Sequence, residues 1–303
     1  MGKVVLVACT NVGRAIIETI ETCEELKNVE LAGVVNLKPE IAINKANYDS
    51  YVDLKEKYNI DMYFCEDVNE TNCMNFIKEC EPDVILQSGW SQKFNEELLN
   101  LAKYACIGEH PAPLPKGRGA ACVNWAILTG EKEWGDTFFK MEMKYDTGEI
   151  YSQELFEITS YDNVKTVYDK VAYAASMAVK KHLPEWSNGV FQSIVQDDSL
   201  ATHYPRRKPS DGEFDFNVNS DKLYNFIRAQ TKPYPGAFFK AKINDKISEI
   251  IVWDAILGNE GIPGSVAVKC KDDKNICLIR VEVKGLPEMW ASDLFDLYDV
   301  EIL

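Results

Sequence analysis

Buried strand signals and helix signals alternate along the first half of the chain, and this alternation constrains the fold more than any other feature. Val4–Ala8 is a continuous apolar run, typical of a parallel strand that is covered on both faces. Val12–Glu25 follows with apolar residues at helical spacing. Further strands are predicted at 31–35, 62–64, 84–86 and 105–107, and further helices at 48–58, 72–79 and 95–104. This rhythm predicts a doubly wound α/β sheet.

The pattern changes in the second half of the chain. We predict helices at 120–128 and 164–183, and strands at 137–143 and 150–156. The basic connector His203–Pro209 is typical of a linker. Beyond it we predict one helix at 221–230 and short strands at 237–242, 249–255, 264–268, 276–283 and 297–303. Short strands punctuated by Gly and Pro indicate a small β-barrel. The predicted domains are therefore residues 1–203 and 204–303.

The charge balance bears on the class of partner. Lys and Arg number 33 and Asp and Glu number 48, so the 303-residue chain carries a net charge of −15. This balance disfavours nucleic acid and anionic membrane surfaces as partners. No apolar run reaches the roughly 18 residues of a membrane span. The nine cysteines form no CxxC pair, which favours reduced thiols in a cytoplasmic protein, and neither they nor the three histidines have zinc-site spacing.

Two segments carry candidate chemistry. The first predicted strand-to-helix turn has only Gly13, so it lacks the glycines of a dinucleotide site, and we expect Gly13 to serve close packing. His110, by contrast, follows a predicted parallel strand and enters a loop with three prolines. Ligands bind at the carboxyl ends of such strands, and a histidine there can act as an acid or a base. A plain surface histidine is the alternative.

The turn Lys144–Glu149 contains the second candidate, Asp146-Thr147-Gly148. Alone, this sequence is typical of a hairpin turn. Beside an imidazole, however, its carboxylate would raise the histidine pKa and fix its tautomer.

Taken together, these residues resemble the folate-dependent formyltransferases, which include methionyl-tRNA formyltransferase and nucleotide-sugar N-formyltransferases. The resemblance rests on two main features, the His110–Ala120 segment (HPxxLPKxRGA) and the Asp146-Thr147-Gly148 turn. Three further segments support it: Glu81–Ile85, Asn124–Ile127 with Gly130-Glu131, and Pro205–Arg207 with Ile227–Phe238. It covers most of the chain.

The resemblance implies a Rossmann-like formyl-transfer domain followed by an OB-like β-barrel, with 10-formyltetrahydrofolate as the cofactor. It implies that His110 is the catalytic histidine and Asp146 its acidic partner. In this family an acceptor amine attacks the formyl carbon, and a proton passes from that amine to N10 of the folate. His110 and Asp146 suit that proton transfer, and a protonated His110 would also stabilise the oxyanion.

One catalytic position departs from the family pattern. The family usually has Asn two residues before the histidine, whereas this chain has Gly108. Glu109 points to the other face of the strand, so it is no simple substitute for the Asn. Three interpretations stay open: another group supplies the oxyanion donor, the chain belongs to a divergent branch with a different acceptor, or it is a weak or inactive homologue.

The resemblance also suggests where ligands bind. Folate is expected near Gln87, Ser88, Gly89 and Trp90 and at the loop after Asp146. Gly89 would permit close backbone approach, and Trp90 would border the pterin or else be a core aromatic. Lys116 and Arg118 would engage anionic substrate groups, unless they are solvated loop charges. Asn11, in the first turn, is a further candidate contact to the acceptor.

The acceptor we favour is a small-molecule amine, an amino group on a nucleotide-linked sugar. A tRNA acceptor predicts a basic channel, but residues 203–240 carry seven basic and four acidic side chains, a modest local excess. Formyl-folate hydrolysis and a binding module without turnover are the remaining alternatives. A homodimer is compatible with the resemblance.

Overall fold

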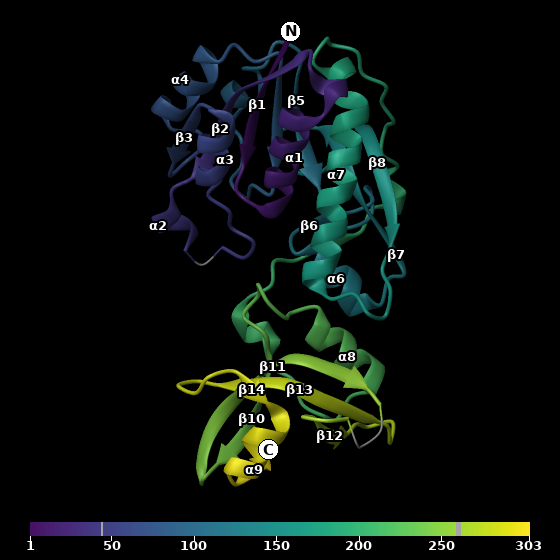
Figure 1. Cartoon of the computed structure of the whole chain (residues 1–303). Coiled ribbons are helices and arrows are strands. Elements are labelled where there is room, and N and C mark those ends of the chain that lie inside the picture. Colours follow the sequence, from purple (N-terminus) through teal and green to yellow (C-terminus); the bar gives the residue numbers. More distant parts are fainter. Residues whose placement is uncertain (44, 259–261) are drawn as a thin grey trace. The chain divides into compact units, whose positions relative to one another are not determined.

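The computed structural model describes residues 1–43, 45–258 and 262–303, and its internal contacts divide the chain into two units (Figure 1). The first comprises residues 1–122, 133–157 and 168–204. The second comprises residues 123–132, 158–167 and 205–303. Two segments that precede the basic connector are thus grouped with the second unit.

The first unit is built on a seven-stranded sheet in the order β3-β2-β1-β4-β5-β7-β8. Its strands are β1 (Gly2–Ala8), β2 (Val29–Leu37), β3 (Met62–Cys65), β4 (Val84–Ser88), β5 (Ala105–His110), β7 (Glu133–Lys140) and β8 (Ile150–Glu157). The first five run parallel, and β7 and β8 add an antiparallel edge. The strand order reverses between β1 and β4, and open α/β sheets bind ligands at the carboxyl ends of strands beside such a reversal.

The helices of this part of the chain are α1 (Asn11–Thr22), α2 (Pro39–Ala42), α3 (Val52–Tyr58), α4 (Thr71–Glu79), α5 (Glu96–Leu99), α6 (Cys122–Thr129) and α7 (Val164–Trp186). Short 3₁₀ turns lie at Glu24–Leu26, Asp198–Leu200 and Pro209–Gly212. The helices α1 and α7 lie side by side in front of the sheet (Figure 1), and Ser176 Oγ donates to Ala15 O between them. The predicted helix at 95–104 is shorter in the structure, being one turn of α5.

The segment before α3 folds over the first strand-to-helix turn instead of extending the helix. Tyr51 is fully buried, and its hydroxyl lies between Thr10 N and Thr10 O. A Cβ on Gly13 would overlap Ala8 and the Tyr51 hydroxyl, which explains the glycine. Arg14 pairs with both Asp49 and Asp53 and so fixes this segment at the start of α1. Because of these contacts, the helix predicted at 48–58 begins only at Val52.

Apolar side chains cover both faces of the sheet. One face carries a cluster that includes Val5, Val7, Ile85 and Cys106 and receives α4. On the other face Phe138 of β7 packs against Trp186 of α7. All nine cysteines are free thiols.

The second unit contains an antiparallel sheet in the order β12-β13-β11-β10-β15, with β14 paired to β13. The strands are β10 (Ala237–Ile243), β11 (Lys246–Leu257), β12 (Val266–Lys269), β13 (Asn275–Val283), β14 (Met289–Trp290) and β15 (Val300–Ile302). Helices α8 (Ser220–Arg228) and α9 (Ala291–Leu297) contribute Leu223, Ile227 and Leu294 to its core. Its architecture is an antiparallel half-barrel, as the strand pattern predicts.

Two short strands outside both large sheets hold the loop after β5. They are β6 (Arg118–Gly119) and β9 (His203–Tyr204), and they pair in parallel. In the described part of the chain, no helix combines the length and apolar character that crossing a membrane requires.

Candidate active site

Three strand ends form the edge of the sheet at which the candidate residues gather. Strands β1, β4 and β5 are neighbours in parallel register, so their carboxyl ends lie together. The loops after β1 and β4 touch, because a Cβ on Gly89 would overlap the side chain of Thr10. Gly89 also has a φ of +60°, which favours glycine. The close approach that this glycine permits is therefore to Thr10.

His110 ends β5 and is 8% exposed. Its Nε2 lies 2.8 Å from Gly117 O. Because a carbonyl only accepts, Nε2 carries a proton, and Nδ1 is the nitrogen that gains or loses one. Burial lowers the pKa of His110, but Cys122, Asp146 and the Gly117 carbonyl outweigh burial and hold the pKa above its ordinary value of 6.5. The imidazole therefore favours the protonated form.

Asp146 is brought to His110 by the turn between β7 and β8. Its Oδ1 lies 3.9 Å from His110 Nδ1, and its Oδ2 accepts a hydrogen bond of 2.9 Å from Gly119 N. Asp146 has a φ of +56°. A Cβ on Gly148 would overlap Lys140 O, so the turn requires a glycine two residues later. The 3.9 Å separation is longer than a hydrogen bond, which leaves Nδ1 able to reach another atom.

Gly108 is explained by its neighbour on β7. Gly108 pairs with Phe139, and a Cβ at 108 would lie 2.8 Å from Phe139 Cε1 and 3.1 Å from Met141 Cγ. The position where the family usually carries Asn is thus bordered directly by an aromatic ring. A side chain at position 108 would therefore require Phe139 or Met141 to move.

The expected folate residues divide into two groups. Gln87 Nε2 donates to Trp90 O, and Trp90 is buried with the apolar cluster on one face of the sheet. Trp90 Nε1 and Asn11 Oδ1 are buried without a hydrogen-bond partner among the described residues. Ser88, in contrast, is fully buried and donates to Glu109 Oε2 at 2.7 Å. The Ser88 hydroxyl therefore uses its proton in a hydrogen bond within the protein.

The two basic residues of the loop after β5 also differ. Lys116 is exposed. Arg118 is 2% exposed, and its guanidinium donates to Gln196 Oε1 and to Asp198 Oδ1. Arg118 thus binds groups of its own chain, so Lys116 is the residue of this pair that can meet an anionic ligand.

Sequence reasoning missed several residues around the site. Cys122, at the start of α6, lies against His110, and Gln196 contacts the Asp146 turn through two hydrogen bonds. Asp136 lies beside Glu109, on the face of the sheet opposite His110. Of these residues, only Glu109 could be placed from the sequence, because side chains alternate along a strand and Glu109 therefore points to the face opposite His110.

Glu109 and Asp136 form a buried pair of carboxyl groups. They are 5% and 2% exposed, respectively. Burial raises the pKa of Asp136 well above its ordinary value, and the neighbouring Glu109 raises it further. Asp136 therefore retains its proton at pH values where exposed carboxyl groups are ionised.

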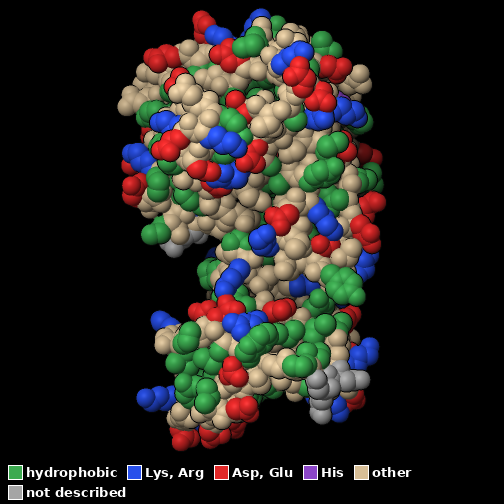
Figure 2. Space-filling view, in the orientation of Figure 1, with side chains coloured by type: hydrophobic (Ala, Val, Ile, Leu, Met, Phe, Trp, Pro, Cys, Tyr) green, Lys and Arg blue, Asp and Glu red, His purple; other side chains and the backbone are tan. Residues whose placement is uncertain are grey.

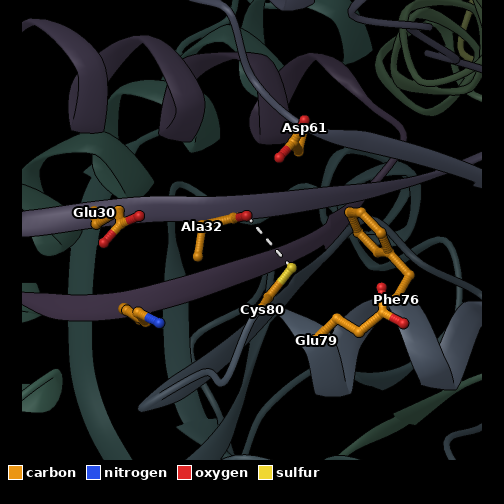
Figure 3. A pocket seen from close by; sticks show the side chains of 7 residues that line it. Glu30, Ala32, Asp61, Phe76, Glu79 and Cys80 are labelled. Atoms are coloured by element: carbon orange, nitrogen blue, oxygen red, sulfur yellow. Dashed lines mark hydrogen bonds between the residues drawn. The ribbon is translucent and has the colours of Figure 1, made fainter.

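A pocket of about 240 Å³ lies elsewhere, beside the amino-terminal half of β1 and β2 (Figure 3). Lys3, Glu30, Asp61 and Glu79 line it together with Ala32, Phe76 and Cys80. Lys3 pairs with Glu81, and Cys80 donates to Ala32 O. This pocket lies toward the amino-terminal ends of the parallel strands, whereas His110 lies at the carboxyl end of β5. Within the described ranges, no three His, Cys, Asp or Glu side chains are placed to hold a metal ion.

We predict that Gly108→Asn lowers the free energy of unfolding by about 1–3 kcal/mol, because the added atoms overlap Phe139. Chemical denaturation measures this loss. Lys140→Ala, at an exposed position next to Phe139, is the control and should stay within about 0.5 kcal/mol of the native chain. Adding Phe139→Ala should recover part of the loss. A Gly108→Asn variant as stable as the native chain would contradict this packing.

We predict that Asp136→Asn raises the melting temperature, and more so at higher pH. The pKa of Asp136 is higher in the folded protein than in the unfolded chain. Above about pH 4 the unfolded chain therefore releases this proton first, which increasingly favours unfolding, and Asn removes that difference. Melting curves at about pH 4.5 and 7.5 should show the larger gain at 7.5. The exposed Glu157→Gln is the control; a gain independent of pH would refute the explanation.

Two family models match the chain. Residues 3–183 match the formyl transferase model, and residues 206–298 match the formyl transferase C-terminal domain. A methionyl-tRNA formyltransferase from Staphylococcus epidermidis is 31% identical over 245 residues, which cover 78% of each chain. The bifunctional polymyxin resistance protein ArnA from Wigglesworthia glossinidia brevipalpis is 31% identical over 227 residues, covering 74% of this chain. This chain spans about a third of the length of ArnA, since the match covers 34% of it.

Solved structures share the fold. The sugar 3N-formyl transferase WlaRD aligns with a TM-score of 0.63 at 18% identity, over 95% of this chain and 99% of its own. HypX from Aquifex aeolicus aligns with a TM-score of 0.66 at 17% identity, over 97% of this chain and 48% of its own. With family models matching nearly its whole length, the chain belongs to the formyl transferase family.

Proposed function

We propose that this chain transfers a formyl group from 10-formyltetrahydrofolate to the amino group of a nucleotide-linked amino sugar. The observation that carries the proposal is the pairing of a buried His110, with Nδ1 free to exchange a proton, and Asp146 at the carboxyl edge of the sheet. Formyl transfer to an amine requires a proton to leave that amine, and this pair is placed to receive and return one.

A feature of this sheet edge supports folate as the ligand. The buried N–H of Trp90 lacks a partner among the described residues, and Trp90 follows Gly89, whose loop touches Thr10. Buried polar atoms are normally hydrogen-bonded, so this unused donor suits a ligand with acceptor atoms, such as a pterin. We assign Gln87, Gly89, Trp90 and the turn after Asp146 to folate. When bound, 10-formyltetrahydrofolate supplies the formyl group.

His110 and Asp146 then have distinct roles. The Gly117 carbonyl holds the ring through Nε2, so Nδ1 is the position at which the protonated ring gives up its proton and then takes one from the acceptor amine. Asp146 stabilises the imidazolium through its charge. A protonated Nδ1 also donates to developing negative charge, which supplies an oxyanion donor where Gly108 has none.

Charge supports a small anionic acceptor over tRNA. Of the seven basic residues at 203–240, four are engaged within their own unit. Arg207 binds Gln230 and stacks on Trp125, Arg228 is buried against backbone carbonyls, and Lys232 and Lys240 pair with glutamates. On the face shown in Figure 2, acidic and basic side chains are intermixed over each unit. Lys116 and Asn11 are the residues we assign to the acceptor.

Two solved structures with this fold support the sugar acceptor by analogy. WlaRD was crystallised in the presence of dTDP and 5-N-formyl-THF. An N-formyltransferase from Helicobacter canadensis, TM-score 0.64 and 17% identity, holds folinic acid and dTDP-3-aminofucose. The second candidate is formylation of methionyl-tRNA, favoured by the 31% identity with the staphylococcal enzyme.

The acceptor is tested by incubating the chain with 10-formyltetrahydrofolate and either a panel of dTDP-, UDP- and GDP-linked amino sugars or methionyl-tRNA. Mass spectrometry should detect a formylated sugar nucleotide. Formylation of methionyl-tRNA at low enzyme concentration would reject the sugar acceptor. Formate without a formylated amine would indicate hydrolysis, and folate binding without any product would indicate a module that does not turn over.

His110→Ala should reduce kcat at least about 100-fold, because the proton-transfer group is lost. Its melting curve should stay close to that of the native chain. His203→Ala, which removes an exposed histidine, is the matched control and should retain full activity. If His110→Ala keeps activity within about tenfold of the native chain, the proposed role of His110 is wrong.

A further inference from the structure

Residues 194–204 connect the two loops that carry the candidate catalytic pair. At one end Ile194 exchanges two backbone hydrogen bonds with Ile150, which directly follows the Asp146 turn. At the other end β9 pairs with β6, in the loop after His110. Between them, Thr202 Oγ1 accepts from Gly117 N at 2.8 Å. One segment therefore contacts both the Asp146 turn and the carbonyl-bearing residue that holds His110.

Gln196 is the side chain of this segment that reaches the Asp146 turn. It is buried, and its Nε2 donates to Asp146 O at 3.0 Å and to Gly148 O at 2.7 Å. Its Oε1 accepts from Arg118 Nε at 3.2 Å and from Nη2 at 2.8 Å. Because a guanidinium only donates, it fixes which end of the amide is the acceptor, and so directs the NH₂ group to the turn.

The backbone of Asp146 needs such support. Its φ of +56° is uncommon for a residue that carries a side chain. The carboxylate is held by one backbone hydrogen bond, from Gly119. A shift of the turn would change the 3.9 Å separation between Asp146 Oδ1 and His110 Nδ1 directly. The two hydrogen bonds from Gln196 lie on either side of Thr147 and resist that shift.

We propose that Gln196 is a positioning residue for the formyl-transfer reaction. Oriented by Arg118, it holds the Asp146 turn so that the carboxylate stays opposite Nδ1 of His110. The hydrogen bonds of Gln196 go to Arg118, Asp146 and Gly148, so it acts on His110 through the Asp146 turn. The expected effect on kcat rests on the proposed function, whereas the expected position of Asp146 relative to His110 does not.

Two variants separate positioning from folding. Gln196→Ala removes the donors to the turn and the acceptor of Arg118. Gln196→Glu keeps an acceptor for Arg118 and the same length, but it presents oxygens that cannot donate to the carbonyls of Asp146 and Gly148 at neutral pH. Gln192→Ala, an exposed glutamine of the same stretch, is the matched control. Thermal melting establishes that each variant folds.

The first measurement is the titration of His110 by NMR in the free protein, with the His110 signals identified by their absence from the spectrum of a His110→Gln variant. Asp146 and Cys122 are the titratable side chains that act on His110. In Gln196→Ala the His110 pKa should fall, because the Asp146 carboxylate is no longer held opposite Nδ1. Gln196→Glu is judged by its kinetics instead, because its added carboxylate by itself raises the pKa of a nearby imidazole. Gln192→Ala should titrate like the native chain. An unchanged His110 pKa in a folded Gln196→Ala variant overturns the proposal.

The second measurement is steady-state formyl transfer to whichever acceptor the panel of sugar nucleotides and methionyl-tRNA identifies. Both Gln196 variants should lose about 10- to 100-fold in kcat, with KM for folate and acceptor changed less than about threefold. A loss confined to KM overturns the positioning role. If the native chain transfers no formyl group to any acceptor, the proposed function fails, whereas the His110 titration still tests whether Gln196 places Asp146.

Discussion

The antiparallel pairing of β7 against β5 is the interaction on which the rest of the site depends. It sets Thr137 beside His110 and Phe139 beside Gly108, and it starts the turn that returns Asp146 to the same edge. Since side chains alternate along each strand, this one register decides the surroundings of both faces. His110 meets Asp146 on one face, and Glu109 meets Asp136 on the other. A shift of one residue would exchange the two environments.

The sequence was sufficient for the architecture of the first unit because its signals are local. Continuous apolar runs and helical spacing depend on neighbours within one element, and the parallel strands and α1 follow from them. The helix predicted at 48–58 was too long for a physical reason. Tyr48 and Tyr51 have helix-compatible spacing, but contacts with Thr10 determine where they lie. Such contacts join residues about forty positions apart, so they produce no periodic pattern in the sequence from which they could be predicted.

The same distinction applies to the site. His110 and Asp146 carry recognisable motifs, and the structure brings them together. Arg118 carries an equally clear motif, yet its guanidinium is buried against Gln196 and Asp198, because no property of the residue itself reveals whether its partner is a ligand or the chain. Gln196 had no signal of its own. Its importance arises only where the loops after β5 and β7 meet the segment before β9.

The buried tyrosine over the first turn has a consequence for how binding specificity can change. Folds that hold dinucleotides place the pyrophosphate against the glycine-rich turn after the first strand. Here the Tyr51 ring occupies the space above Gly13, and Arg14 ties its segment down through Asp49 and Asp53. Introducing the missing glycines alone would therefore not create a nicotinamide site. A dehydrogenase could arise from this fold only if Tyr51 and the two aspartates that bind Arg14 were also replaced.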